Sequence, residues 1–594
     1  MSDQSNYEAL DYQLADLLAE LDQSKNTVLY QTVLDISQKT REGCIALMCD
    51  TQQSETLLKT KVVTIADEIK PLVVDNGFIY LYRYWSYQQR LAQQITSRLQ
   101  VEFDDVDQNW AKQRLQYYFS QDDVTTTETN TGEEVNWQQA AAALALSSRF
   151  LIISGGPGTG KTTTITRILA FLIEQNIKEN KAKLRFSLAA PTGKAAMRMS
   201  EAIRDSIQRE GDKLSLEIIE QLPQEASTIH RLLGYIPNST EFRFNKNNYL
   251  AADIVVIDEA SMIDLALMSK LFAAIPTQAK VILLGDKDQL SSVETGSVFT
   301  DLCATANNQY NAATRTYLQA LTGATFKRTE ENSEQSNIDN HIVCLQKSWR
   351  FDKHSGIGKL AAAVNKGDAK SSVSILKDEG FVDVELILSS EFKRNQLIEP
   401  WQYYLQAIKS KADIDELFAA FNRFRILTAL RRGMNGCVYL NTQLEKQLSQ
   451  QNKLNTWKRW YHGRPIMITE NSYRTGLFNG DIGITLIDEQ GQAKVWFQSK
   501  EGIKAFSPVR LPQHETAWVT TIHKSQGSEF EKVLMILPSE DTAVLTRQLI
   551  YTGITRAKQQ LTVVVSEAIL ALGVSRETPQ ATQIQRVLKV GTLV

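Results

Sequence analysis

The sequence predicts an α/β protein with two parallel-sheet domains, a small inserted β-barrel and a mainly helical N-terminal unit. Short apolar runs alternate with helical stretches from residue 137 to about residue 323, a pattern typical of a doubly wound parallel sheet. A second set of such runs follows residue 331 and predicts a second sheet of the same kind. Within it, residues of about 440–515 change to short strands separated by Gly, Asn and Asp turns, which favours a small barrel.

The predicted boundaries follow from this pattern. Residues 1–120 form the first unit, and 121–135 are polar and Thr-rich, as expected of a linker. The first sheet domain is predicted over 136–330 and the second over 331–594. The strand candidates are 150–153, 184–189, 254–257 and 281–284 in the first domain, and 424–429, 533–537 and 561–565 in the second.

Composition and charge restrict the class of protein. The chain has 594 residues, of which 43% are hydrophobic and 22% charged, as in a folded protein of roughly three or four domains. No apolar run reaches the roughly 20 residues of a membrane span, and no membrane association is expected. The net charge of −3 argues against a globally basic nucleic-acid coat but allows a local positive channel. Five scattered cysteines without a Cys-x-x-Cys pair predict a reducing cytoplasm, without structural zinc or disulfides.

The strongest motif is a phosphate-binding loop. Residues 155–162 read GGPGTGKT, directly after the apolar run 150–153 and before a predicted helix at 163–174. Its glycines let the backbone N–H groups turn toward phosphate oxygens, and the helix adds the positive end of its dipole. Lys161 places an ammonium near the β- and γ-phosphates, and the Thr162 hydroxyl is placed to bind Mg²⁺. The loop therefore predicts that the chain binds a nucleoside triphosphate.

Further polar residues complete a predicted hydrolysis site. Asp258 and Glu259 end an apolar strand about 100 residues after the loop, where the first acid can act on Mg²⁺ and the second as general base. Gln289 follows a third strand and suits a sensor of the γ-phosphate, although a plain turn explains it nearly as well. Arg350 and Arg556, about 200 residues apart, are candidates for arginine fingers that reach across a cleft.

At this point the ordered motifs resemble those of superfamily 1 DNA helicases. The matching segments are GGPGTGKTTT, APTGKAA, STIHRLLG, DEASM, GDKDQL, SWRF, TIHKSQGSEF and YTGITRAK, while NWQQA resembles the adenine-reading Q motif. Within that superfamily WYHGRPIMIT, GLFNGDIGI and RLPQHETAW resemble the RecD family, the alpha subunits of exodeoxyribonuclease V (RecBCD). The resemblance covers about residues 136–560. It implies two RecA-like domains, an SH3-like barrel and an ATP-dependent 5′→3′ DNA motor.

The resemblance also implies roles for individual residues. The catalytic residues would be Lys161, Asp258, Glu259, Gln289, Arg350 and Arg556, with Thr162 and Asp258 at the Mg²⁺. The ATP site would include Gln138, Gly155, Gly156, Pro157, Gly158, Thr159, Gly160, Lys161, Thr162 and Thr163. The single strand would lie along Pro191, Thr192, Thr228, His230, Thr521, His523 and Lys524.

Partners are implied in the same way. A RecD-like subunit would work in a cytoplasmic heterotrimer with RecB-like and RecC-like subunits, on single-stranded DNA and duplex ends, in double-strand break repair and homologous recombination. Residues 1–120 would face the partner. The acids Asp104, Asp105, Asp122 and Asp123 are typical of a solvated face rather than a metal site, so nuclease activity is expected in another subunit. The segment 242–244 would lie in a hairpin at the duplex junction, or form an ordinary half-buried hairpin.

Two alternatives remain open at the level of sequence. One is a stand-alone RecD-like 5′→3′ helicase without a nuclease complex. The other is a catalytically quiet subunit that only clamps DNA or supports assembly. The intact lysine, both carboxylates and both arginines speak against the second alternative.

Overall fold

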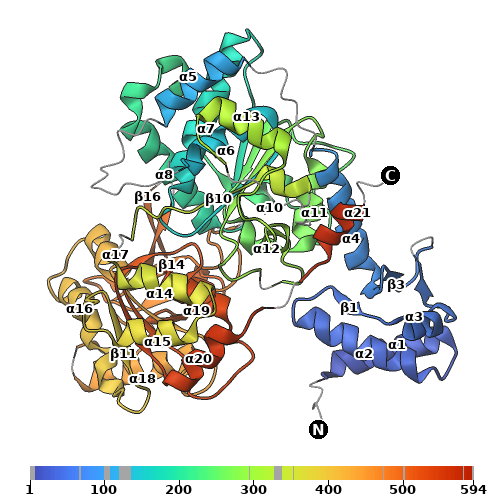
Figure 1. Cartoon of the computed structure of the whole chain (residues 1–594). Helices are drawn as coiled ribbons and strands as arrows, with labels where there is room; N and C mark the ends of the chain where they lie inside the picture. The colour runs from blue at the N-terminus through green and yellow to red at the C-terminus, as the bar shows by residue number, and fades with distance from the viewer. Residues whose placement is uncertain are drawn as a thin grey trace.

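The computed structural model of the chain describes residues 7–65, 68–99, 107–119, 135–292, 294–326, 337–351, 354–451, 453–472, 474–499, 502–578 and 581–590. The predicted linker, except Val135, lies outside these residues, as do Asp104, Asp105, Asp122 and Asp123. Figure 1 shows one sheet domain above, a second below it, and an N-terminal unit beside the second.

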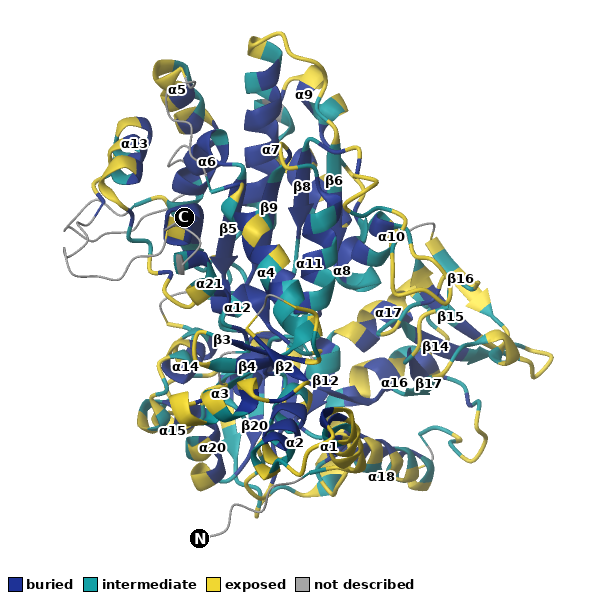
Figure 2. Ribbon diagram, turned by 90° about the vertical axis from the view of Figure 1, so that its right-hand side faces the viewer, coloured by how far each residue is buried: buried dark blue, intermediate teal, exposed yellow. Residues whose placement is uncertain are grey.

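The first domain is built on a six-stranded sheet in the order β10-β5-β9-β8-β6-β7, with every neighbouring pair parallel. Successive side chains of β5 enter opposite cores, with Phe150 and Ile152 on one face and Leu151 and Ile153 on the other. Helices therefore cover both faces, and the strands between them are dark blue in Figure 2. The strands are β5 (Phe150–Gly155), β6 (Phe186–Ala190), β7 (Ser227–Thr228), β8 (Ile254–Ile257), β9 (Lys280–Gly285) and β10 (Ile342–Leu345).

Helices of the first domain fall into two layers. The layer on the Leu151 side contains α6 (Trp137–Ser147), α7 (Lys161–Lys178), α8 (Gly193–Arg209), α9 (Leu216–Gln221) and α13 (Ala312–Thr322). The layer on the Phe150 side contains α10 (Ile229–Leu233), α11 (Leu265–Ala274) and α12 (Val298–Leu302).

The second domain is built on a five-stranded parallel sheet in the order β11-β20-β19-β12-β18. Its strands are β11 (Val384–Ile387), β12 (Phe424–Thr428), β18 (Val519–Thr521), β19 (Phe530–Ile536) and β20 (Ala557–Val564). One face packs on α14 (Gly356–Asn365), α15 (Ala369–Lys377), α19 (Arg547–Ile554) and α20 (Glu567–Ser575). The other packs on α16 (Gln402–Lys409), α17 (Ile414–Asn422) and α18 (Cys437–Gln450). The two predicted parallel sheets are therefore both present.

An antiparallel sheet is inserted between α18 and β18, in the order β16-β15-β14-β13-β17. Its strands are β13 (Pro465–Ile468), β14 (Ile482–Ile487), β15 (Ala493–Ser499), β16 (Gly502–Phe506) and β17 (His514–Thr516). Ile466, Ile468, Val495 and Phe497 form a small core of its own. Helix α18, which overlaps the predicted start of the insertion, packs instead in the core of the parallel-sheet domain.

The N-terminal unit contains, besides its helices, a small sheet that the sequence analysis did not predict. Helices α1 (Ala9–Asp22), α2 (Thr27–Arg41) and α3 (Thr51–Leu58) share a core with a four-stranded sheet in the order β1-β4-β3-β2. The strands are β1 (Ala46–Met48), β2 (Val63–Thr64), β3 (Leu72–Asp75) and β4 (Phe78–Leu81), and α4 (Tyr82–Thr96) and α5 (Gln108–Tyr118) follow. Both of these later helices pack against the first sheet domain, so the independent unit ends near residue 81.

The boundary between the two sheet domains also differs from the prediction. Strand β10 lies beyond residue 330 yet pairs with β5, so the first sheet reaches Leu345. Helix α21 (Ile584–Val590), near the C-terminus, packs on α4 and α12 of the first half of the molecule, as Figure 1 shows. Both differences come from long-range packing, which local periodicity does not report. No helix in the described part of the chain is long and apolar enough to cross a membrane.

The segment before α21 is anchored by hydrogen bonds from three parts of the chain. The carboxylate Oδ2 of Asp301 accepts bonds of 2.6 Å from both the backbone N–H and the hydroxyl of Thr582. Gln583 N–H donates to Oε1 of Gln88 (2.8 Å), and Ile45 N–H donates to the carbonyl of Ala581 (2.9 Å). The segment therefore ties the first sheet domain and the N-terminal unit to the end of the chain.

Asp301 makes this anchor sensitive to pH. Burial raises its pKa from 3.8 to about 7, while the hydrogen bonds from Thr582 oppose the rise. A carboxyl whose pKa is raised on folding contributes stability that is complete below pH 3.8 and is lost as the pH rises through about 7. We expect Asp301→Asn, which keeps an oxygen for Thr582, to lose less thermal stability than the wild type between about pH 6 and pH 8. Melting temperatures of both proteins at both pH values test this, and equal losses would contradict it.

Candidate nucleotide and nucleic-acid site

The phosphate loop joins the end of β5 to the start of α7. Gly158 (φ 77°) and Gly160 (φ 80°) adopt left-handed backbone conformations that glycine reaches without steric cost. A Cβ on Gly158 would also collide with the Cβ of Arg350. The Lys161 ammonium lies within the loop and donates to the carbonyls of Gly155 (2.6 Å) and Gly156 (3.2 Å). The whole predicted loop thus sits at the N-terminus of an 18-residue helix, where an anion is favoured.

The two predicted carboxylates lie beside this loop. Asp258 directly follows β8, and its Oδ1 accepts a hydrogen bond from the Glu259 N–H (2.8 Å). Glu259 holds a positive φ of 51°, a conformation that costs a side chain like Glu energy and is often found at functional sites. Burial and the Glu259 charge raise the pKa of Asp258 to about 6, and Lys161 opposes the rise. A cation at this carboxylate would stabilise its ionised form, so Asp258 and the Thr162 hydroxyl suit a Mg²⁺ carried by a nucleotide.

Gln289 is bound to an acid that sequence reasoning missed. The buried carboxylate Oδ2 of Asp286 accepts hydrogen bonds from Nε2 of Gln289 (2.9 Å) and from the hydroxyl of Tyr551 (3.2 Å). Burial raises the pKa of Asp286 to about 6, against the charge of Lys161. Because Tyr551 belongs to α19, Asp286 connects the two sheet domains. The motif GDKDQL contained Asp286, but its partner could only be found in three dimensions.

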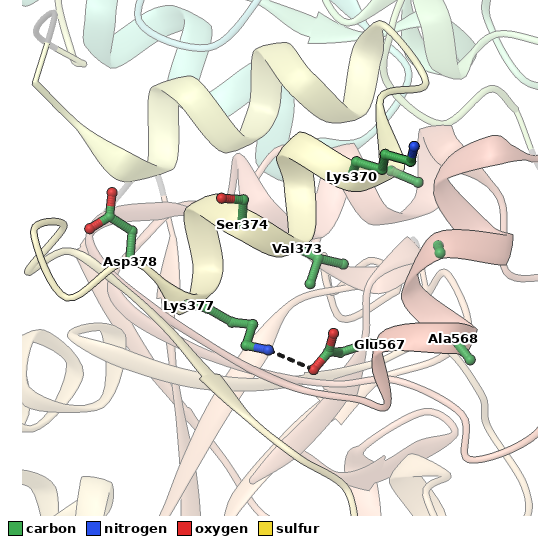
Figure 3. Close-up of a pocket in the computed structure, with 9 residues that line it drawn as sticks. Lys370, Val373, Ser374, Lys377, Asp378, Glu567 and Ala568 are labelled. Atoms are coloured by element: carbon green, nitrogen blue, oxygen red, sulfur yellow. Dashed lines mark hydrogen bonds and ion pairs between the residues drawn. The ribbon is translucent and has the colours of Figure 1, made fainter.

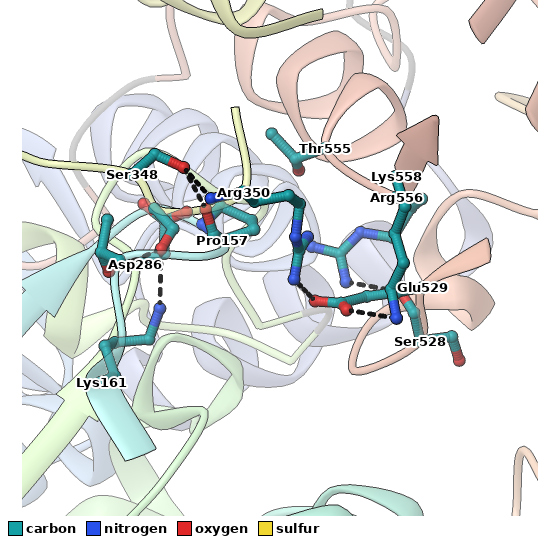
Figure 4. A network of polar contacts seen from close by, with 12 residues as sticks. Pro157, Lys161, Asp286, Ser348, Arg350, Ser528, Glu529, Thr555, Arg556 and Lys558 are labelled. Atoms are coloured by element: carbon teal, nitrogen blue, oxygen red, sulfur yellow. Dashed lines mark hydrogen bonds and ion pairs between the residues drawn. The ribbon is translucent and has the colours of Figure 1, made fainter. Parts of the chain in front are cut away.

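The two predicted arginines lie close together in a network of polar contacts (Figure 4). The segment that carries Arg350 is tied to the phosphate loop, because Trp349 N–H donates to the carbonyl of Gly158 (2.8 Å). Nη2 of Arg350 donates to Oε1 of Glu529 at 2.6 Å. Arg556 is buried, and it donates to the carbonyls of Thr552 (Nε, 3.0 Å) and Ser528 (Nη1, 3.1 Å). Arg556 therefore also supports the local fold of the second domain.

Gln138 and Trp349 border the same loop. Nε2 of Gln138 on α6 donates to the carbonyl of Thr159 (3.1 Å). A Cβ on Gly160 would lie 2.8 Å from that nitrogen and 3.7 Å from the Trp349 ring. The Trp349 side chain is 50% exposed, and the Lys347 ammonium lies 4.4 Å from its ring centroid. Trp349 was missed from the sequence, although its place beside Arg350 in SWRF was a signal for it.

The predicted DNA-contacting residues fall into two groups. In the first domain Thr192 caps α8 and Thr228 caps α10, at the ends of the paired strands β6 and β7. Pro191 precedes Thr192, and the His230 ring packs edge-on against Phe242 (5.6 Å). In the second domain Thr521 ends β18 and is followed by the short helix that contains His523 and Lys524.

Two features modify the predicted chemistry of these groups. Burial lowers the pKa of both His230 and His523, so both imidazoles are neutral at pH 7. The Lys524 ammonium is paired with Oε1 of Glu515 on β17 at 2.7 Å.

Phe242, in the segment 242–244, packs partly buried against the core of the first domain, as it would in an ordinary half-buried hairpin.

Other hollows lack comparable chemistry. A shallow hollow of about 750 Å³ lies between α15 and α20, lined by alanines and by the ion pair of Lys377 with Glu567 (Figure 3). A second, of about 340 Å³, lies where the N-terminal unit meets both sheet domains, with Glu42, Asp288 and Glu577 in its lining. Within the described ranges, no group of three or more His, Cys, Asp or Glu side chains could hold a metal ion, and all five cysteines are free.

Comparisons with known proteins show which families the chain resembles. The family described as an AAA domain matches residues 138–295, and the UvrD-like helicase C-terminal domain matches residues 516–564. The chain is 38% identical to the "RecBCD enzyme subunit RecD" of Haemophilus influenzae, over 85% of this chain and 79% of that protein. It is 36% identical to the protein of the same name in Mycolicibacterium smegmatis, over 76% and 74%. It is 28% identical to the "ATP-dependent RecD2 DNA helicase" of Deinococcus radiodurans, over 69% and 46%.

Proposed function

The chain belongs to the RecD family of RecBCD enzyme subunits, and we propose that it is the ATP-dependent 5′→3′ DNA helicase subunit of a RecBCD-type exodeoxyribonuclease. The observation that carries this proposal is that a phosphate loop, two carboxylates and two arginines lie where the two parallel-sheet domains contact each other. Hydrolysis of a nucleotide held between two domains can move one against the other. The direction 5′→3′ is taken from the family resemblance, as are the roles in double-strand break repair and homologous recombination.

The ATP site takes its roles from the geometry of the cleft. Lys161 and the N–H groups of the loop bind the phosphates, and Glu259 orients and activates the attacking water. Thr162 and Asp258 would hold a Mg²⁺ brought by the nucleotide, and the ion would neutralise phosphate charge. Gln289 senses the γ-phosphate and passes its state to Tyr551 through Asp286. Gln138 reads the adenine edge, and the half-exposed Trp349 beside it offers a face on which the base stacks.

The DNA groove runs along both domains. Thr192, Thr228 and Thr521 offer hydroxyl groups at strand ends, and neutral His230 and His523 offer N–H donors, to phosphate oxygens. Such contacts grip a single strand without reading its sequence, as a motor requires. Lys524 contributes its charge to the strand only after leaving Glu515, so its contact is weaker than its charge alone suggests.

Mutation of the two histidines should weaken DNA binding without lowering the basal ATPase activity. We expect a double variant, His230→Ala with His523→Ala, to bind single strands about tenfold or more weakly and to lose DNA stimulation while keeping basal ATPase. Because both imidazoles are neutral, the change in affinity should be the same at pH 7 and pH 8, and the salt dependence should be unchanged. Fluorescence anisotropy over a salt series, with ATPase assays, measures this. Loss of basal turnover at unchanged DNA affinity would place the histidines in the nucleotide cleft.

The N-terminal unit offers a surface for a partner. Leu10, Leu17 and Leu21 on α1 are 60%, 51% and 52% exposed, and their spacing places them along one side of the helix. Exposed leucines in a row are typical of protein–protein contacts. We place the RecC-like subunit on this face and the RecB-like subunit in the same complex. As separate parts of the proposal, we assign the cleavage of DNA to another subunit and place the complex in the cytoplasm.

Purification of the chain, alone and with candidate RecB-like and RecC-like subunits, tests the proposal. DNA-stimulated ATPase and unwinding that depend on Lys161 support it, and Leu17→Glu should weaken assembly without changing basal ATPase. Strong unwinding by the chain alone, without binding to partners, would favour the stand-alone helicase. The isolated chain should leave labelled DNA uncut. Mg²⁺-dependent degradation that survives Lys161→Gln would contradict the assignment of cleavage to another subunit.

A further inference from the structure

Glu529 lies between the two arginines but has no role in the proposed site. It stands immediately before β19, and its two carboxylate oxygens bind different cations. Oε1 accepts the 2.6 Å bond from Nη2 of Arg350, and Oε2 lies 3.5 Å from the ammonium of Lys558 (Figure 4). The carboxylate thus forms the centre of a positive cluster at the domain cleft.

The ion pair of Glu529 with Arg350 spans the two domains. On one side the backbone next to Arg350 is bonded to the phosphate loop at Gly158. On the other side Arg556 holds the Glu529 segment through the carbonyl of Ser528 (3.1 Å), and its own carbonyl accepts from Phe530 N–H (2.9 Å). Both partners are therefore held by their backbones, and the pair has a defined geometry.

The guanidinium of Arg350 is held at only one of its two terminal nitrogens. Nη2 is bound by Glu529, whereas Nη1 is buried and has no hydrogen-bond partner among the residues that the structure describes. A buried cationic donor without an acceptor is costly, and an anion at Nη1 would remove that cost. The planar fork of arginine suits this arrangement, because one acceptor fixes the direction of the remaining donors.

The Glu529 carboxylate is ionised at physiological pH. Burial would raise its pKa, but the Arg350 charge and hydrogen bond outweigh burial, with help from Arg198 and Lys558, and lower the pKa to about 2. The ion pair therefore persists at every pH at which the protein would work.

We propose that Glu529 is a positioning residue that holds one edge of the Arg350 guanidinium so that the other faces the terminal phosphate of the bound nucleoside triphosphate. This inference rests on the proposed function, because it assigns a role within the same ATP site.

The test compares Glu529→Gln with a matched control, Glu531→Gln. Glu531 is the second residue of β19 and also pairs with an arginine, Arg423 at 2.9 Å, but on the surface of the second domain. The full-length chain is used, with partner subunits if it needs them. The ATPase rate that remains in the Lys161→Gln variant is subtracted from every measured rate as background. We expect Glu529→Gln to lower kcat with saturating DNA by about tenfold or more at unchanged ATP affinity, and Glu531→Gln to resemble the wild type.

A double-mutant cycle separates positioning from a general structural effect. In an Arg350→Ala background, Glu529→Gln should change kcat by less than about twofold, because residues that act as a unit are not additive. An equal loss in both backgrounds would overturn the inference, as would a normal kcat for Glu529→Gln or a loss confined to ATP affinity. Any of these results with an active wild type leaves the proposed function intact, whereas a wild type without Lys161-dependent ATPase rejects the proposed function itself.

Discussion

Replacing Lys161 by Gln is expected to abolish ATP turnover, with a loss of about a thousandfold or more, while nucleotide still binds. The Lys161 ammonium is the cation that the structure places inside the phosphate loop, at hydrogen-bond distance from Gly155 and Gly156. Glutamine removes the charge that stabilises the β- and γ-phosphates, but it leaves the backbone N–H groups and the helix N-terminus that cradle them. Steady-state ATPase and equilibrium binding of a fluorescent nucleotide measure the two effects separately.

A matched control for this variant is Lys178→Gln at the other end of the same helix. Lys178 pairs with Asp107 on the surface, so its loss should change ATPase little. Turnover by Lys161→Gln at more than a few per cent of the wild-type rate would remove the loop from the hydrolysis site.

Replacing Arg350 by Ala is expected to lower kcat by about a thousandfold at nearly unchanged ATP affinity. The guanidinium lies where the phosphate-loop side meets Glu529 of the second domain, and it should stabilise charge that develops on the γ-phosphate only in the transition state. Arg350→Lys should restore little, since an ammonium cannot bond to Glu529 and the phosphate with a planar fork. Single-turnover hydrolysis with DNA bound measures the chemical step directly.

Arg556→Ala should also leave ATP bound and unhydrolysed, with an added loss of thermal stability. Its donors bond to the carbonyls of Thr552 and Ser528, and both bonds would be lost, although the Thr552 carbonyl keeps a bond from the Thr555 hydroxyl (3.2 Å). Arg423→Ala, a surface variant, serves as the control for both arginines. A near-normal rate for Arg350→Ala or Arg556→Ala with DNA present would show that the residue is not an arginine finger.

The parts of the proposed site that consist of a few consecutive residues could be predicted from the sequence. The phosphate loop, the pair Asp258 and Glu259, and the strand before each depend on local chemistry, since glycine conformations and apolar runs are properties of neighbouring residues. In the structure the Lys161 charge is near enough to Asp258 to lower the pKa of its carboxyl against the effect of burial. Asp286 and Glu529 were missed because an acid in a polar motif acquires a role only through the residue that it meets.

Domain boundaries were less predictable. Strand β10 falls within the predicted second domain, yet it pairs with β5 of the first sheet. Helices α4 and α5, which fall within the predicted N-terminal unit, pack against the first domain. Residues near a boundary have the same local periodicity whichever core they enter. The packing partner decides, and that partner lies far away in the sequence.

The sequence by itself determined which residues the proposed site can use, namely a glycine-rich loop, a carboxylate pair and two arginines, and it predicted the two parallel sheets that carry them. Local residue types suffice for these, because each depends on the conformation or charge of a few neighbouring residues. Only the tertiary structure decided which cation meets which anion across the cleft. The Arg350–Glu529 pair joins residues 179 positions apart, and the Tyr551–Asp286 bond joins residues 265 apart. Such contacts form only after hydrophobic burial has folded each domain, because the packing of the two domains then decides which strand ends lie next to each other.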